Sequence, residues 1–175
     1  MRQGYRQTGN MATIKTSLSG DALLVTELQA NEGLSEPFSV RLQLKSENAS
    51  IDTAALVGQK VTVTINLSNG SQRFFHGIFK SLGLETIDAA FAYYTAEIVP
   101  ELWRMELDRD RRIFQNLSAV EIIEQYLQYY AIVFEKQLIG AYQSREYCVQ
   151  YDESSLHSLS RLMQEEGLWY FFKQS

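Results

Sequence analysis

Apolar and polar residues alternate along the first half of the chain, which predicts β-strands. Residues 37–45, PFSVRLQLK, place every second side chain on an apolar face and the others on a polar face. This is the pattern of a strand with one face buried and the other in water. The polar face of this strand carries Arg41, Gln43 and Lys45. Residues 22–32, ALLVTELQANE, begin with an apolar run and predict another strand.

A β-hairpin is predicted farther along. Residues 60–67, KVTVTINL, alternate and are followed by SNGS at 68–71. An Asn-Gly pair between two alternating runs favours a type I′ turn, which needs positive φ at both central residues. The returning strand over 72–87 is long and contains Gly77 and Gly83. Glycines inside a strand predict bulges or bends, as a strongly coiled sheet requires.

Two more elements complete this half. Residues 89–102, which read AAFAYYTAEIVPEL, predict a strand that pairs back across a turn at Asp88. Residues 53–58 predict a short helix. Antiparallel strands in this number, one of them long and bent, predict a small barrel or sandwich.

The second half changes to a helical pattern. Ser118 and Glu121 form a capping box, in which each side chain satisfies a backbone amide at the start of a helix. Apolar residues then recur on one side of the helix, and they are Ala119, Val120, Ile123, Tyr126, Leu127, Tyr130 and Ala131. This pattern predicts an amphipathic helix that packs on a core.

A strand, a second helix and a last strand follow. Residues 145–151, REYCVQY, alternate, and residues near 154–166 carry a leucine-rich apolar stripe that ends at Gly167, a residue suited to the left-handed position after a helix. The run LWYFF at 168–172 predicts a strand. We expect it to pair with the strand at 145–151, or otherwise to fray or self-associate, because soluble proteins avoid exposed apolar edges.

Composition and charge exclude some classes of function. The chain has 175 residues, of which 45% are hydrophobic and 21% charged, as in ordinary globular proteins. Its net charge of -5 and pI near 5.1 argue against nucleic acid or an anionic membrane as a partner. Arg109, Arg111 and Arg112 are separated by acids, and we interpret this cluster as a solvated charged turn or strand edge. The single cysteine, Cys148, is interpreted as a small packed or interfacial side chain rather than a nucleophile.

No motif of a hydrolase, a metalloprotease or a nucleotide-binding protein is present. We therefore name no catalytic, cofactor-binding or metal-binding residue. His157 has Glu153 and Arg161 four residues away on either side, which is the spacing of an exposed charged stripe on a helix. His76 lies in a predicted strand and is interpreted as a hydrogen-bonded histidine of the barrel.

Neighbouring acids leave one weaker alternative open. The acids occur in three groups, which are Asp108 with Asp110, Asp152 with Glu153, and Glu165 with Glu166. Two carboxylates are what a glycoside hydrolase uses. A small carbohydrate or peptidoglycan hydrolase acting through Glu153 or Glu165 is therefore a competing hypothesis, although acids adjacent in sequence are more often a solvated face.

Several segments, taken together, resemble a known family. In chain order they are SGDALLVTELQANEGLSEPFSVRLQLKSE, IDTAALVGQKVTVTI, FFHGIF, RRIFQNLSAVEIIEQYL and SREYCVQYDESSLHSLSRLMQEEGLWYFF. They look like the N-terminal part of VgrG, the valine-glycine repeat spike protein of type VI secretion systems, a part that is similar to the baseplate hub protein of contractile phage tails. The resemblance covers residues 17–172, and its last segment is highly specific.

The resemblance implies a structural role without enzymatic activity or cofactor. The implied partners are the hexameric, Hcp-like tube protein, two further copies of the full-length chain in a homotrimer, secreted effectors and baseplate proteins, with no nucleic acid. Such a spike is assembled in the bacterial cytoplasm without a signal peptide and is delivered to the extracellular space or a target cell on contraction. A phage tail hub protein is the alternative within the same fold. The polar face with Arg41, Gln43 and Lys45 is a candidate for tube contact only in the sense that any solvent-exposed face of a strand is.

Pattern and resemblance together predict an α+β protein. We expect a disordered leader over 1–12 and an antiparallel β-barrel of the tube-type hub class over 13–102. A helical α+β segment over 103–175 follows, and we expect it to be truncated at its C-terminus because nothing in the sequence corresponds to a second barrel or a needle.

Overall fold

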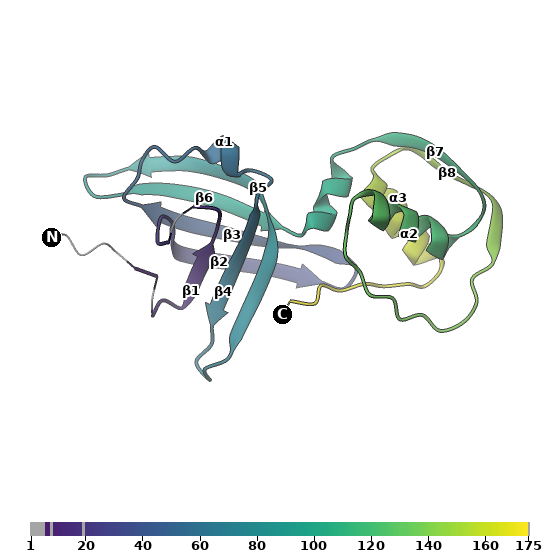
Figure 1. Ribbon diagram of the computed structural model, residues 1–175, viewed down its shortest axis with the longest axis horizontal. Helices are drawn as coiled ribbons and strands as arrows, with labels where there is room; N and C mark the ends of the chain where they lie inside the picture. The colour runs from purple at the N-terminus through teal and green to yellow at the C-terminus, as the bar shows by residue number, and fades with distance from the viewer. Residues whose placement is uncertain (1–5, 8, 19, 175) are drawn as a thin grey trace. The chain divides into compact units, whose positions relative to one another are not determined.

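The chain forms two compact units in the structure, a computed structural model that describes residues 6, 7, 9–18 and 20–174 (Figure 1). The first, here called the sheet unit, holds the residues up to Gly33, Phe38–Pro100 and the segment from Phe172 onward. The second, here called the helical unit, holds Leu34–Pro37 and Glu101–Phe171. Within the described residues, no helix is long and apolar enough to cross a membrane.

The sheet unit is a six-stranded antiparallel half-barrel with the strand order β1-β4-β5-β6-β3-β2. Its elements are β1 (Ala12–Lys15), β2 (Leu24–Gly33), β3 (Glu36–Ser46), α1 (Thr53–Leu56), β4 (Lys60–Asn66), β5 (Gln72–Ile87) and β6 (Ala92–Val99). The predicted α+β class is confirmed. The predicted barrel is only half formed, because β1 and β2 are edge strands and no ladder joins them in the described part of the chain.

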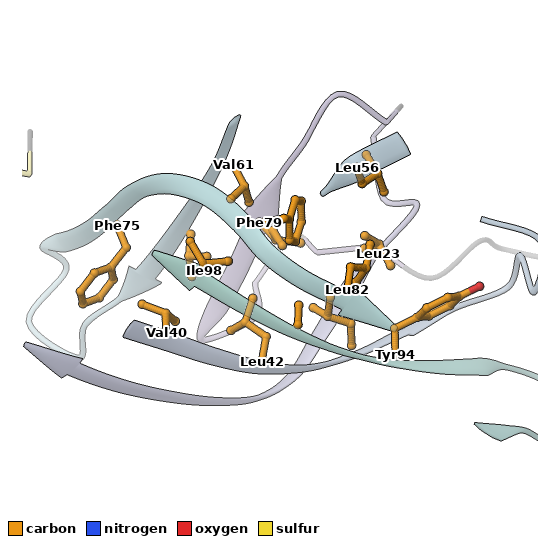
Figure 2. Close-up of a cluster of buried hydrophobic side chains, with 14 of the residues drawn as sticks. Leu23, Val40, Leu42, Leu56, Val61, Phe75, Phe79, Leu82, Tyr94 and Ile98 are labelled. Carbon is orange, nitrogen blue, oxygen red and sulfur yellow. The ribbon is translucent and has the colours of Figure 1, made fainter. Parts of the chain in front are cut away.

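Alternation along the strands builds the core of the sheet unit. Phe38, Val40, Leu42 and Leu44 of β3 are each at most 3% exposed, as the sequence pattern predicts. Figure 2 shows buried side chains of β3, β5 and β6 gathered in one cluster, with Leu56 of α1 among them. Burying apolar side chains of this size contributes roughly 1.5–3 kcal/mol each, which makes this cluster the main source of the unit's stability.

The hairpin between β4 and β5 is confirmed, but the predicted type I′ turn is wrong. Of the two central residues, only Gly70 has positive φ, at 83°. The N–H of Gly70 donates to the carbonyl of Leu67, and the N–H of Leu67 donates to the carbonyl of Ser71. A type I turn followed by a left-handed glycine accounts for this arrangement. Leu67, predicted on the buried face, is 44% exposed because it belongs to the turn.

The irregularities of β5 lie beside its glycines rather than on them. The register against β6 shifts between Phe79 and Ser81 and again between Leu84 and Thr86. Gly77 has a different role, since a Cβ at this position would lie 2.3 Å from the carbonyl oxygen of Val99. Glycine is therefore required there for a close approach of two backbones.

The N-terminal residues fall partly outside the described chain. The predicted disordered leader covers residues 1–12, of which 1–5 and 8 are not described. Gln7 is described and buried, and its side chain bonds to both backbone groups of Ile14, with Nε2 donating to the carbonyl at 2.9 Å and Oε1 accepting from the N–H at 2.5 Å. Its backbone N–H also donates to Asp21 Oδ1 at 3.0 Å.

The helical unit packs two helices with a two-stranded sheet. Its elements are η1, a 3₁₀ helix (Glu101–Glu106), β7 (Asp110–Ser118), α2 (Ala119–Tyr129), β8 (Ser144–Glu153) and α3 (Ser155–Glu165). The strands β7 and β8 pair antiparallel.

One sequence expectation fails at the start of this unit, and another agrees with the structure. The strand predicted over 89–102 ends at Val99 and is followed by η1, because Pro100 has no N–H with which to continue a ladder. The charged cluster, interpreted as a turn or strand edge, lies at the start of β7 in a two-stranded sheet, with Arg109 just before the strand and Arg111 within it.

The ends of the helices follow the sequence closely. Ser118 and Glu121 form the predicted capping box of α2. Gly167 has φ +66°, and the N–H of Leu168 donates to the carbonyl of Met163 at 2.7 Å, which closes α3 with a left-handed glycine as predicted.

The buried face of α2 differs from the predicted stripe. Its buried residues are Ala119, Ile122, Ile123 and Tyr126. Ile122 was absent from the predicted stripe, and Ala131, which was included, is exposed with φ 54° because the helix has already ended at Tyr129.

The predicted pairing of residues 168–172 with the strand at 145–151 is wrong. That strand is β8, and β7 occupies the ladder with it. Residues 168–172 have no regular secondary structure, and their contacts are described below.

Candidate functional site

The acids considered for a hydrolase lie in a chain of ion pairs along one side of α3. Arg161 bonds to Glu153 at 2.8 Å and to Glu165 at 3.1 Å. His157 Nδ1 lies 2.9 Å from the other oxygen of Glu153. The exposed charged stripe predicted for His157 is therefore confirmed. Both candidate carboxylates are held by Arg161, Glu165 on the exposed face of α3 and Glu153 at the end of β8, where its side chain is 14% exposed.

Arg145 extends this chain from β8 to the end of α3. Its two terminal nitrogens bond to Glu165 at 2.6 Å and to Glu166 at 2.5 Å. The hydrogen bond from Arg145 lowers the pKa of Glu165 below its ordinary value. A general acid of a glycosidase needs a raised pKa, which is the opposite of the shift at Glu165.

Asp108 and Asp110 also have structural partners. Asp108 accepts the backbone N–H of Ser155 at 3.0 Å, the hydroxyl of Ser155 at 2.7 Å and a short hydrogen bond from the hydroxyl of Tyr130. Burial by itself raises the pKa of Asp108, but these hydrogen bonds outweigh it and the pKa is lowered. Asp110 pairs with Arg112 at 2.7 Å. These acids fasten β7 and its approach to the start of α3.

The remaining candidates for chemistry are structural as well. His76 Nδ1 lies 2.9 Å from Thr62 Oγ1, and its ring stacks on Phe74 with centroids 5.9 Å apart, which confirms the hydrogen-bonded histidine. Cys148 is buried, as predicted for a packed side chain. Within the described residues, no group of three or more His, Cys, Asp or Glu side chains could hold a metal ion.

A buried polar cluster in the helical unit was not predicted from the sequence. The hydroxyl of Tyr126 lies 2.8 Å from Gln150 Oε1 and 3.0 Å from Ser158 Oγ. All three residues are at most 1% exposed, and burial raises the pKa of Tyr126 to about 12. The cluster joins α2, β8 and α3, and its satisfied hydrogen bonds fix how these elements pack.

The polar face of β3 is an ionic surface shared with its neighbours. Arg41 lies opposite Glu97 in the β3–β6 ladder, and Lys80 of β5 bonds to Glu97 at 3.1 Å. Lys45 lies over the ring of Phe91, 4.7 Å from its centroid. The face therefore carries both positive and negative side chains, which suits a polar protein–protein contact but identifies no partner.

Exposed apolar side chains gather on the outer face of the β7–β8 sheet. The register places Arg111 opposite Tyr151, Ile113 opposite Val149 and Gln115 opposite Tyr147, all on one face. Ile113, Tyr147 and Tyr151 are 62%, 55% and 70% exposed. Three exposed apolar side chains thus lie on one face beside Arg111 and Gln115, which makes this face a candidate contact surface.

The connection between α2 and β8 carries more exposed apolar side chains. It runs over residues 130–143 without a helix or strand. Val133 and Ile139 are 97% and 98% exposed. Its exposed apolar side chains make this segment a second candidate contact surface of the helical unit.

The C-terminal segment is extended and alternates in burial. Within the helical unit, the carbonyl of Tyr170 accepts the N–H of Ser35 at 2.9 Å. Trp169 and Phe171 are 60% and 63% exposed, with ring centroids 5.9 Å apart. Within the sheet unit, Phe172 packs on the core, and its ring meets that of Phe38 edge-on at 5.2 Å. The apolar segment predicted as a strand is thus held at alternate residues, by Tyr170 in the helical unit and by Phe172 in the sheet unit.

The arrangement of a curled antiparallel sheet, a hairpin and two helices is shared with known proteins. The chain matches the family described as phage tail baseplate hub (GPD) over residues 31–175. The chain belongs to the phage tail baseplate hub family. The resemblance stated from the sequence is confirmed by this match.

Relatives of this hub family member are spike proteins. Type VI secretion system spike proteins VgrG1a, VgrG1b and VgrG1c of Pseudomonas aeruginosa are 36%, 34% and 34% identical to it. The alignments cover 95%, 95% and 97% of this chain but 26%, 23% and 23% of those relatives. The chain therefore spans about a quarter of the length of the relatives it matches. Their names describe a structural role, in agreement with the prediction that the chain is not an enzyme.

Solved structures carry the same hub fold. The E. coli c3393 protein, described as a component of the type VI secretion system with structural similarity to the T4 bacteriophage tail proteins gp27 and gp5, matches with a TM-score of 0.73 and 25% identity. The match covers 86% of this chain and 45% of that protein. The 43 kDa tail protein of prophage MuSo2 from Shewanella oneidensis matches with a TM-score of 0.61 at 14% identity, which supports the fold alone.

Proposed function

We propose that this protein is a structural component of the hub and spike of a type VI secretion system. The observation that carries the proposal is the joint match to a type VI component in sequence and in fold, over 86% of the chain. The geometry of the candidate residues also supports the proposal, because Glu153, Glu165 and His157 contact charged partners and Asp108 accepts the N–H of Ser155 at the start of α3.

The proposed partners are other proteins of the same machine. A hub joins the hexameric tube to the puncturing needle, so its partners would be the Hcp-like tube protein, baseplate proteins, secreted effectors and two further copies in a homotrimer of the full-length form. The charged face around Arg41 and Glu97 and the apolar face around Ile113 offer two chemically different surfaces for such contacts. In this role the protein assembles in the bacterial cytoplasm and leaves the cell on contraction.

A phage tail hub is the second candidate, and a specific observation favours it. The matching family is named for the phage baseplate, and a prophage tail protein shares the fold. The two functions differ in the machine that is served. We favour secretion because the more similar relatives are type VI spike proteins.

The test is binding to the tube protein together with loss of the machine's output. The chain is mixed with purified hexameric tube protein, and the gene is inactivated in its own bacterium while release of tube protein into the medium is measured. We expect a complex in the first experiment and loss of release, restored by the intact gene, in the second. Absence of both would overturn the proposal, and particles with a packaged genome in place of released tube protein would favour the phage tail.

The surface that docks can be tested in the same binding experiment. Arg41→Glu reverses one charge on the β3 face, whereas Arg161→Glu changes a charge on α3 as a control. A weaker complex for the first variant alone would assign tube contact to the β3 face. Equal binding by both variants would remove that face from consideration.

A further inference from the structure

Strand β5 is longer than the strand beside it. It begins at Gln72, but its ladder with β6 begins only at Ile78, opposite Val99. Residues 72–77 pair with β4 on one side. In the described part of the chain, no strand pairs with these residues on the other side, because β6 ends before Pro100.

The C-terminal segment reaches this edge of β5. The backbone N–H of His76 donates to Gln174 Oε1 at 2.8 Å. A backbone N–H in a strand points to one neighbour only, so the N–H bound by Gln174 faces away from β4. The side-chain carbonyl of Gln174 thus takes the place that a backbone carbonyl of a paired strand would occupy.

An aromatic ring anchors the same segment two residues earlier. Phe172 joins the core of the sheet unit and lies edge-on against Phe38, whose ring is 5.6 Å from that of Phe75 in β5. Phe172 and Gln174 therefore hold the segment at two points, one in the core and one on the strand edge.

We propose that Phe172–Gln174 act as a strap that closes the edge of β5 at residues 72–77 against the addition of a strand from another molecule. The edge of a sheet offers N–H and C=O groups in the spacing of a strand, which makes it a template for association, and proteins cover such edges with loops or short segments. Two features of the strap allow it to cover the edge of β5. Its ring fixes it to the body of the sheet unit, and its amide engages the backbone of the edge.

The first experiment measures hydrogen exchange at the amide of His76. Gln174→Leu removes the acceptor and keeps the approximate size, whereas Gln174→Glu keeps an acceptor oxygen. Losing one hydrogen bond changes the equilibrium between the closed and open states of the amide by about tenfold or less. We therefore expect the amide of His76 to exchange about fivefold faster in Gln174→Leu. It should return close to the original rate in Gln174→Glu. Phe171→Ala, which changes an exposed neighbour, serves as the matched control.

The second experiment measures association. The double variant Phe172→Ala/Gln174→Leu should have a larger mass by light scattering than the unmodified chain at the same concentration, and Trp169→Ala/Phe171→Ala should not. Circular dichroism checks that the sheet is retained, and the single Gln174→Leu variant keeps the test valid if the double variant unfolds. Unchanged exchange at His76, or a double variant no more associated than the unmodified chain, would overturn the proposal.

Discussion

Replacing Gly77 by alanine tests the closest backbone approach in the sheet unit. A Cβ at this position would lie 2.3 Å from Val99 O, whereas ordinary contacts of this kind begin near 3.4 Å. The two strands would have to separate by about 1 Å at the end of the β5–β6 ladder. Overpacking of this kind costs about 1–3 kcal/mol, against which the loss of glycine's freedom in the unfolded chain contributes about 0.4–1 kcal/mol of stabilisation.

The same strand provides a matched control. Gly83 also lies in β5, and a Cβ there would meet no atom within 4 Å, so Gly83→Ala should be neutral or slightly stabilising. We expect the free energies of unfolding of the two variants to differ by about 2 kcal/mol, with Gly77→Ala the less stable. Urea denaturation followed by circular dichroism measures the difference, which corresponds to roughly 4–8 °C in Tm for a chain of this size. Equal stability of the two variants would refute the close approach.

Three further substitutions probe the helical unit. Ser118→Ala removes the capping side chain of α2 and should lower the free energy of unfolding by about 1 kcal/mol, whereas Gln125→Ala on the exposed face of α2 should leave it nearly unchanged. Tyr126→Phe removes the hydroxyl that meets Gln150 and should cost about 1–3 kcal/mol in urea denaturation, with a zero cost contradicting the polar cluster. Because the folded pKa of Asp108 lies below its ordinary value of 3.8, Asp108 stabilises the fold above about pH 4, and this contribution is lost as the pH falls through the folded pKa. Asp108→Asn should therefore be less stable at neutral pH and should show a shallower loss of stability on acidification; an unchanged acid profile would rule the role out.

Local patterns predicted the elements whose signals lie within one segment. The alternation in β3 placed Phe38 and Val40 in the core, and the capping box marked the first residue of α2. These signals succeed because burial of one face and satisfaction of a helix end are decided by residues close in sequence. The spacing around His157 predicted its ion pair for the same reason.

The elements that were missed depend on contacts between distant segments. β7 carries arginines in place of a clean alternation, and it is a strand because β8 pairs with it over its length. Residues 168–172 were expected to join that ladder, but their anchors are Ser35 and Phe38, more than a hundred residues earlier in the chain. The alternation marks Phe38 as buried, but no local pattern indicates that Ser35 or Phe38 contacts residues 168–172.

The candidate site divides in the same way. The sequence identified the acids, and the stripe on α3 suggested that they are solvated, but Arg145 reaches Glu165 and Glu166 only after β8 and α3 have packed. The hydrogen bonds of Gln150 inside the helical unit were equally out of reach. The alternation alone predicts a solvent-exposed glutamine, whereas the hydroxyl of Tyr126 and the carbonyl of Glu153 satisfy the buried side chain of Gln150.

The change of neighbouring strand along β5 has a mechanical consequence. β5 pairs with β4 through its first part and with β6 through its second, and the two ladders overlap only around Ile78 and Phe79. A pull that draws β4 away from β6 therefore passes through the β4–β5 ladder, then along the covalent backbone of β5, and then through the β5–β6 ladder. The backbone of β5 around Ile78 joins the two halves of the sheet covalently, so the halves separate under force only when one of the two hydrogen-bonded ladders opens.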